Sequence, residues 1–162
     1  MATYPLPCTP APAYEYAFQD PQATMTLAEG IAEFYQRHPN RIYVAREHRH
    51  KLFLNAHDAL HVLFGCPPTF EGEWRLAWWT MLATDFELLL YPRLAISRRV
   101  QTTIVKGGLV NASLAFFGSL GELAAIVWRS RYLRGKWPAR YFENHLNERL
   151  VDVRRAFGIR LG

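Results

Sequence analysis

Four side chains that could bind a metal ion lie within one short stretch, HDALHVLFGCPPTFEGE. His57 and His61 are four residues apart, Asp58 follows the first of them, and Glu73 follows the second by twelve residues. On a helix, residues four apart lie one above the other, so both imidazoles could reach one ion. Two neutral histidines with two carboxylates suit zinc, iron(II) or manganese better than copper(I), which prefers sulfur. The stretch therefore predicts a metal site at His57, Asp58, His61 and Glu73, which are also the candidate catalytic residues.

The two histidines are expected on one helix and Glu73 on the next. The histidine helix is indicated by apolar residues at helical spacing, and it should end at Gly65, before two prolines. Glu73 then falls in the first turn of the following helix, where the helix dipole favours an anion. Asp58 is about 100° around its helix from His57, so it could be a metal ligand or a partner that orients the histidine.

The rest of the chain also favours helices. Thr26 and Glu29 form a capping-box pattern that predicts a helix start, and no long segment alternates with period two. We therefore expect an all-α protein: a single-domain helical bundle over residues 25–162, preceded by an extended, proline-rich segment over residues 1–24. Its metal site should lie on two adjacent helices. The expected helices are 27–38, one ending at 65, 71–91, 98–134 with breaks at Gly107, Gly108 and Gly118, and 138–158.

The most apolar window covers residues 109–128 and has the length of a membrane span. Asn111 and Glu122 lie inside it, and the chain's mean hydropathy is slightly negative. A buried helix is the preferred interpretation of this window.

Cysteine content and the N-terminus indicate a cytoplasmic protein. Two cysteines are too few for a disulfide framework, and neither lies in a CxxC zinc pattern. The first twelve residues carry four prolines and no charge, whereas a secretory signal begins with basic residues and an apolar run.

Positive charge is concentrated in the second half of the chain. Residues 1–97 hold 7 Lys and Arg against 10 Asp and Glu, while residues 98–162 hold 12 against 4. No nucleic-acid-binding motif accompanies these arginines, so nucleic acid is not expected as a partner. A solvated helix face is the simplest explanation. An anionic ligand or an anionic membrane surface, with the protein peripheral on the inner face of the membrane, is the alternative.

Residues 57–73 also resemble a known family. The pattern HDALH, followed by eleven residues and Glu73, is similar to the HDxxH-x11-E signature of the fourth protein of coenzyme Q (ubiquinone) biosynthesis. The C-terminal stretch YFENHLNERLVDVRRAFGI is similar to the closing helix of that family, and the resemblance extends over roughly residues 25–160.

The resemblance implies an all-helical protein with a bound divalent metal, zinc by family resemblance. It implies action on a prenylated, 4-hydroxybenzoate-derived precursor of ubiquinone, whose ring carboxylate at C1 is replaced by a hydroxyl. His57, Asp58, His61 and Glu73 carry over as ligands at their motif positions. Partners would be the isoprenoid-tailed quinone precursor, other ubiquinone biosynthesis proteins and a second copy in a homodimer.

The chemistry of that reaction bears on the metal. Replacing a carboxylate by a hydroxyl is oxidative, and zinc has no redox chemistry, so a catalytic role favours iron(II). A protein that binds lipid as a scaffold, with a structural metal, is one alternative. A metal-dependent phosphohydrolase using His38 and Asp85 with the His-Asp pair is another, although that set does not require His61 or Glu73.

Overall fold

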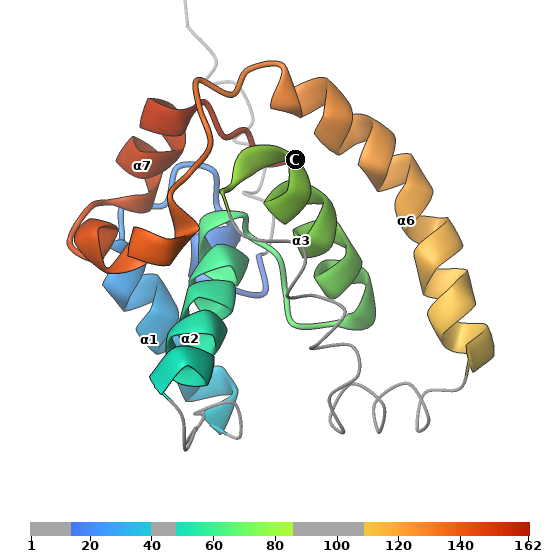
Figure 1. The fold of residues 1–162 in the computed structure, drawn as a ribbon, viewed down its shortest axis with the longest axis horizontal. Coiled ribbons are helices and arrows are strands. Elements are labelled where there is room, and N and C mark those ends of the chain that lie inside the picture. Colours follow the sequence, from blue (N-terminus) through green and yellow to red (C-terminus); the bar gives the residue numbers. More distant parts are fainter. Residues whose placement is uncertain (1–13, 40–47, 86–108) are drawn as a thin grey trace, which may run out of the picture.

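The protein is all-α, as predicted. A computed structural model describes residues 14–39, 48–85 and 109–162, and no strand occurs within these ranges (Figure 1). Its helices are the 3-10 helix η1 (Ala17–Gln19), α1 (Leu27–Arg37), α2 (His48–Leu63), α3 (Phe70–Ala83), α6 (Leu109–Ser130), the 3-10 helix η4 (Ala139–His145) and α7 (Leu150–Phe157).

Helix α1 begins where the capping box predicts. The amide of Glu29 donates to Thr26 Oγ1 at 3.2 Å, and the amide of Thr26 donates to Glu29 Oε2 at 2.7 Å. Each partner satisfies an amide that lacks a helical acceptor, so the start of α1 is fixed locally. The helix ends at Arg37, before Pro39.

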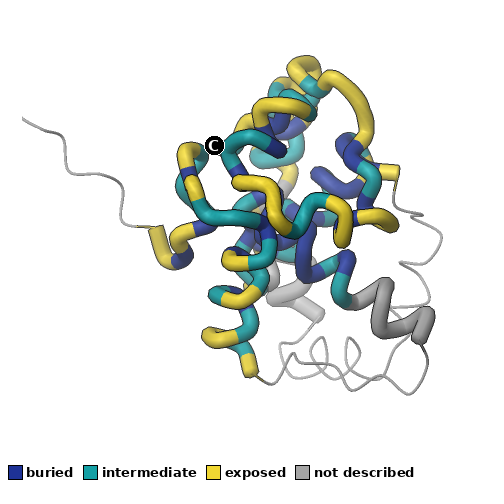
Figure 2. Tube along the Cα trace, turned by 90° about the vertical axis from the view of Figure 1, so that its left-hand side faces the viewer, coloured by how far each residue is buried: buried dark blue, intermediate teal, exposed yellow. Residues whose placement is uncertain are grey.

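The core lies between α1, α2, α3 and α7, and it includes residues that precede α1. Figure 2 shows buried positions on the segments that face one another and exposed positions on the outer turns. Phe34 of α1, Leu60 of α2 and Trp79 of α3 are almost completely buried. The described part of the N-terminal segment, which we expected to be extended, contributes Tyr16 and Phe18 to this core. This part of the segment therefore packs against the helices through its aromatic side chains.

The last predicted helix is divided into η4 and α7, which corrects the expectation of one helix over 138–158. Residues 146–149 pair with the start of α1 instead: the amide of Ala28 donates to the carbonyl of Leu146, and the amide of Leu27 donates to that of Glu148. These bonds satisfy free amides in the first turn of α1. Tertiary hydrogen bonds therefore interrupt a helix that the local sequence favours.

Helix α3 is shorter than predicted, because Thr84 has extended backbone and the helix stops at Ala83 rather than near residue 91. The amide of Trp137 donates to the carbonyl of Ala83, and the amide of Asp85 donates to that of Trp137. This pairing draws the chain out of the helix. Residues 86–91, like the expected breaks at Gly107 and Gly108, lie outside the described residues.

From residue 117 onward, helix α6 is not buried as expected for its apolar sequence; the side chains of residues 109–116 lie outside the described ones. It runs along the outer side of the molecule beside α3 (Figure 1). Arg75 of α3 forms a bidentate ion pair with Glu122 of α6, and Ile126 is buried. Phe117 and Trp128 are 65% and 56% exposed, and Gly118 does not break the helix. No helix among the described residues is long and apolar enough to cross a membrane.

Close contact between α1 and α2 requires glycine at position 30. A Cβ atom on Gly30 would lie 2.4 Å from Cγ1 of Val62, whose branched side chain has little rotamer freedom. We expect Gly30→Ala to lower the free energy of unfolding by about 1–3 kcal/mol in urea titrations. Gly118→Ala is the control, because nothing lies within 4 Å of the added atom. That variant should match or exceed the native stability, and equal losses in both would contradict the packing explanation.

Candidate metal centre

The structure brings His57, His61 and Glu73 together. His57 and His61 are on successive turns of α2, with ring centroids 4.8 Å apart, and Glu73 is in the first turn of α3. Glu73 Oε2 lies 3.5 Å from Nε2 of His57, and its Oε1 lies 3.4 Å from Nε2 of His61. One carboxylate therefore faces the same nitrogen of both imidazoles.

The turn between α2 and α3 depends on two glycines. Gly65 has a φ of 63°, a left-handed conformation that glycine adopts without strain and that ends α2. A Cβ atom on Gly72 would lie 1.8 Å from the carbonyl oxygen of Pro67. Only a residue without a side chain lets the first turn of α3 approach this carbonyl. Thr69 caps α3 by accepting a hydrogen bond from the amide of Gly72.

The same turn determines which nitrogen of His61 carries the proton. His61 Nδ1 lies 3.0 Å from the carbonyl oxygen of Cys66, which can only accept, so Nδ1 is the protonated nitrogen. Nε2 of His61 then presents a lone pair. It is buried and has no hydrogen-bond partner among the described residues. A lone pair and a carboxylate oxygen that face each other at 3.4 Å repel unless a cation lies between them.

The pKa shifts describe the charges of the metal-free cluster. Burial lowers the pKa of His61, so its ring is neutral near pH 7. Burial also opposes the charged form of His57, but its hydrogen bonds to Asp58 and Glu73 and their negative charges raise its pKa to about 9. Burial alone would raise the pKa of Glu73, yet the neighbouring protonated His57 holds it far below its usual range. The metal-free cluster thus holds a proton on His57 and a charged Glu73.

Asp58 is buried behind His57. Its Oδ2 accepts a hydrogen bond from the Tyr35 hydroxyl at 3.0 Å, and its Oδ1 lies 3.7 Å from Nδ1 of His57. Asp58 also offers an oxygen that lies, with one nitrogen each of His57 and His61, in a group whose atoms are all within 4.8 Å. Because an imidazole cannot direct both nitrogens at one ion, contact with Nδ1 suits an orienting role.

Sequence reasoning missed Tyr35. It comes from α1, more than twenty residues before Asp58, and no local spacing connects the two. A tyrosine on an amphipathic helix is usually a core residue, so only the packing of α1 on α2 identifies it as a partner of the site.

The cluster is open on one side. His61 and Asp58 are almost completely buried, whereas the side chains of His57 and Glu73 are 15% and 38% exposed. A ligand could therefore reach the facing nitrogens and carboxylate from the side of His57 and Glu73.

A buried arginine holds the end of α2 in place. The guanidinium of Arg154, on α7, donates to the carbonyl oxygens of Val62 and Leu63 at the end of α2. It also donates to those of Phe18 and Asp20 in the N-terminal segment. Burial lowers its pKa to about 10, so it remains charged at neutral pH. One side chain satisfies four carbonyls from two segments next to His61.

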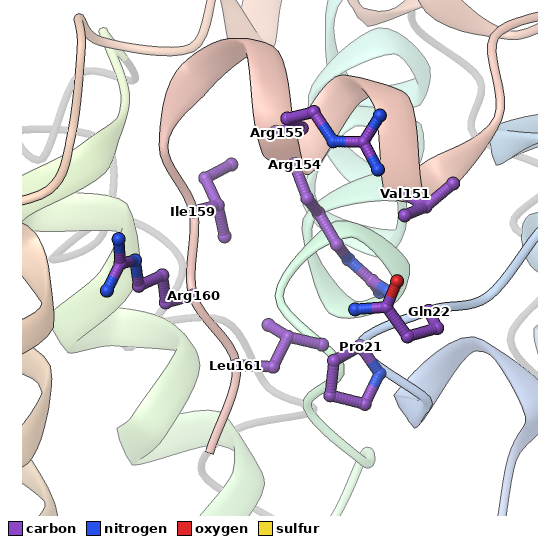
Figure 3. A pocket seen from close by; sticks show the side chains of 8 residues that line it. All are labelled: Pro21, Gln22, Val151, Arg154, Arg155, Ile159, Arg160 and Leu161. Atoms are coloured by element: carbon purple, nitrogen blue, oxygen red, sulfur yellow. The ribbon is translucent and has the colours of Figure 1, made fainter.

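A pocket of about 200 Å³ lies beside Arg154, apart from the metal-binding cluster. Figure 3 shows the Arg154 side chain reaching inward past Gln22, whereas the guanidinium of Arg160 points away toward another part of the molecule. The pocket is lined by Pro21, Gln22, Val151, Arg154, Arg155, Ile159, Arg160 and Leu161. The charged guanidinium of Arg154 in this pocket already donates hydrogen bonds to carbonyls of α2 and of the N-terminal segment.

His38 and Asp85, the residues of the phosphohydrolase alternative, have other partners. Nε2 of His38 lies 2.7 Å from the Tyr16 hydroxyl, and the carboxylate of Asp85 accepts the amide of Ala139 at 2.9 Å. Neither belongs to the group with metal-binding geometry that the described residues form.

No protein-family model, curated protein or solved structure matches the chain.

We expect Tyr35→Phe to weaken metal binding. Loss of the hydroxyl removes a hydrogen bond that holds Asp58 against His57, and such losses lower metal affinity by about 10- to 100-fold. The measurement is a zinc titration against a competing chelator, with circular dichroism as the check on folding. Tyr16→Phe is the matched control, because it removes a buried hydroxyl bonded to His38 instead. Similar affinities for both variants would show that Tyr35 has no part in positioning the site.

Proposed function

We propose that the cluster binds one divalent metal ion through Nε2 of His57, Nε2 of His61 and the carboxylate of Glu73. The observation that carries this proposal is the buried lone pair on His61 Nε2, which faces a carboxylate oxygen with no hydrogen between them. A metal ion would remove this repulsion and attract both groups. The donors fit a divalent cation, since imidazole and carboxylate suit zinc and iron(II).

Asp58 is assigned to orientation. It accepts from Tyr35 and lies against Nδ1 of His57, so the opposite nitrogen of that ring is directed at Glu73. The Cys66 carbonyl does the same for His61. Each histidine is thus oriented through its second nitrogen, as metal-binding histidines generally are. Two neutral histidines, Glu73 and nearby Asp58 balance the charge of the ion.

Within this proposal the protein acts in ubiquinone biosynthesis. Support comes from the HDxxH-x11-E resemblance together with the convergence of His57, His61 and Glu73, residues from two helices. The reaction would be oxidative decarboxylation and hydroxylation at ring C1 of a prenylated, 4-hydroxybenzoate-derived intermediate. The bond from C1 to the carboxylate would break with release of CO2, and a C1–O bond would form with one atom of dioxygen as the oxidant. The other oxygen atom would leave as water, with two electrons and two protons from an external donor. A redox-active metal such as iron(II) would supply the electron chemistry, whereas zinc would supply only Lewis acidity.

The open side of the cluster is the expected approach for the ring. His57 and Glu73 are the partly exposed members, so carboxylate and phenolate oxygens of the substrate would enter beside them. Buried His61 and Asp58 would remain shielded from water. We place the isoprenoid tail near α3 and α6, which lie side by side. The side chains at the start of α6 lie outside the described residues.

A structural metal in a lipid-binding scaffold is the second candidate. The buried position of His61 favours it, because a metal joining α2 to α3 would cross-link two core helices. The phosphohydrolase alternative gains no support from the described residues.

Metal binding should depend on pH through His57. Its pKa of about 9 in the metal-free site means that binding near pH 7 must displace about one proton. His61 and Glu73 need release none, because burial keeps His61 neutral and the charge of His57 keeps Glu73 ionised. We expect zinc affinity to rise about tenfold per pH unit from pH 6.5 toward 9. Calorimetry in buffers of different ionisation enthalpy counts the protons, and release of none near pH 7 would contradict this assignment.

Elemental analysis of protein purified without oxygen tests the metal itself. We expect about one ion per chain and a loss of more than about 100-fold in affinity for His61→Ala, which removes a ligand. His145→Ala is the matched control, since His145 pairs with Glu148 at the surface. Full retention of metal by His61→Ala would refute the proposed site.

The catalytic and structural roles are separated by removing the metal. If the ion is catalytic, the stripped protein should remain folded by circular dichroism and fail to convert a prenylated hydroxybenzoate substrate to its C1-hydroxylated product. Unfolding upon removal would indicate the scaffold instead. A folded, metal-loaded protein that never converts this substrate would refute the enzymatic proposal.

A further inference from the structure

One face of α6 exposes apolar side chains that the metal centre does not use. Phe117, Leu120, Val127 and Trp128 are 65%, 41%, 47% and 56% exposed, and Ala124 between them is exposed as well. At 100° per residue these five positions fall within an arc of roughly 100–120°, with buried Ile126 on the opposite side of the helix. We call this set the α6 stripe. Contiguous apolar patches of this kind mark interaction surfaces more often than isolated exposed residues do.

Positive charge borders the C-terminal end of the stripe. The guanidinium of Arg131 lies over the ring of Trp128, 3.9 Å from its centroid. Arg160 lies over the ring of Tyr132 at 3.5 Å, and Tyr132 is 41% exposed. The chain from Trp128 to Trp137 carries no acidic residue and also contains Arg134 and Lys136, both exposed. Apolar side chains are thus followed by aromatic rings that each carry a stacked arginine.

We propose that the α6 stripe docks on the surface of an anionic lipid bilayer. The stripe lies in the region between headgroups and acyl chains, and Arg131 and Arg160 contact the anionic headgroups. Helices that lie in this interface combine an apolar face with basic residues, and tryptophan and tyrosine favour the same depth. The stacked arginines keep their charge at the edge of the aromatic surface, where headgroups are available. This inference does not depend on the metal centre.

Charge complementarity favours a bilayer over a second copy of the chain. Two copies joined through the stripe would bury their apolar residues, but the acidic residue in the sequence of α6, Glu122, already pairs with Arg75 and so does not offer its charge to the arginines of a second copy. An anionic bilayer provides both an apolar layer and a negative layer. The described helices do not include a membrane span, so docking would occur at the surface.

Flotation of the full-length, metal-loaded protein with vesicles tests the proposal. We expect binding to phosphatidylcholine vesicles that contain about one third phosphatidylglycerol, weak binding to phosphatidylcholine alone, and release in about 0.5 M salt. Phe117→Ser combined with Trp128→Ser should weaken binding by at least about tenfold. Tyr141→Ser is the matched control for an exposed aromatic residue, because Tyr141 is 63% exposed and lies outside α6.

The contribution of the arginines to vesicle binding is tested with two double variants, each of which removes two arginines. Arg131→Gln with Arg160→Gln should lower binding by about tenfold. Arg149→Gln with Arg155→Gln should change it less than about threefold, since these exposed residues of the α7 region pair with Asp152. Equal losses in the two double variants, or unchanged binding of the Phe117 and Trp128 variant, would overturn the proposal. So would a dimer that dissociates in that variant while vesicle binding is absent throughout.

Discussion

The hydrogen bonds of buried Arg154 position the end of the helix that carries the metal-binding histidines. Its planar guanidinium reaches carbonyls at the end of α2 and in the segment before α1, two places far apart in the chain. The carbonyls of Val62 and Asp20 also accept backbone amides, from Gly65 and Ala23. For Leu63 and Phe18, the guanidinium is the donor that the described residues provide, and leaving such a buried carbonyl unsatisfied costs more than an average hydrogen bond contributes. A lysine has three donors on one atom and could not satisfy four carbonyls in this arrangement. Arg154 therefore ties the end of α2 and the N-terminal segment to α7, next to His61.

In the metal centre, helices held in this way bring together two groups that repel each other, the lone pair of His61 Nε2 and a carboxylate oxygen of Glu73. Each histidine is oriented by a neighbour: His57 by Asp58, and His61 by the Cys66 carbonyl. Without a metal ion, His57 carries a proton between Asp58 and Glu73, and the lone pair of His61 is directed at Glu73. A site that is strained in this way without a cation, and relaxed with one, gains affinity because its ligands are already in place. Tyr35 extends the support to α1, so three helices contribute to one small cluster.

Helix α6 has a different physical character from the other helices. Its inner side is held to α3 by an ion pair and by Ile126, and its outer side presents apolar residues to solvent. Burying such a sequence completely would require another layer of helices, which the described residues do not provide. The exposed apolar side and the stacked arginines at its end support the proposal that this side of α6 lies against a lipid bilayer. The core and the metal centre would then face away from the bilayer.

Much of the fold and of the site could be predicted from local sequence. The all-α class, the capping box at Thr26 and the placement of His57 and His61 on one helix face depend on spacing alone, because helical geometry is periodic. The contact of Glu73 with both histidines depends on how α3 packs against α2. Gly65 and Gly72, in the turn between these helices, allow the close approach that this packing needs. Tertiary structure alone determined the division of the last helix, the end of α3, the exposure of α6 and the contact of Tyr35 with Asp58. Each of these depends on hydrogen bonds or packing between residues far apart in the chain, for which local periodicity contains no signal.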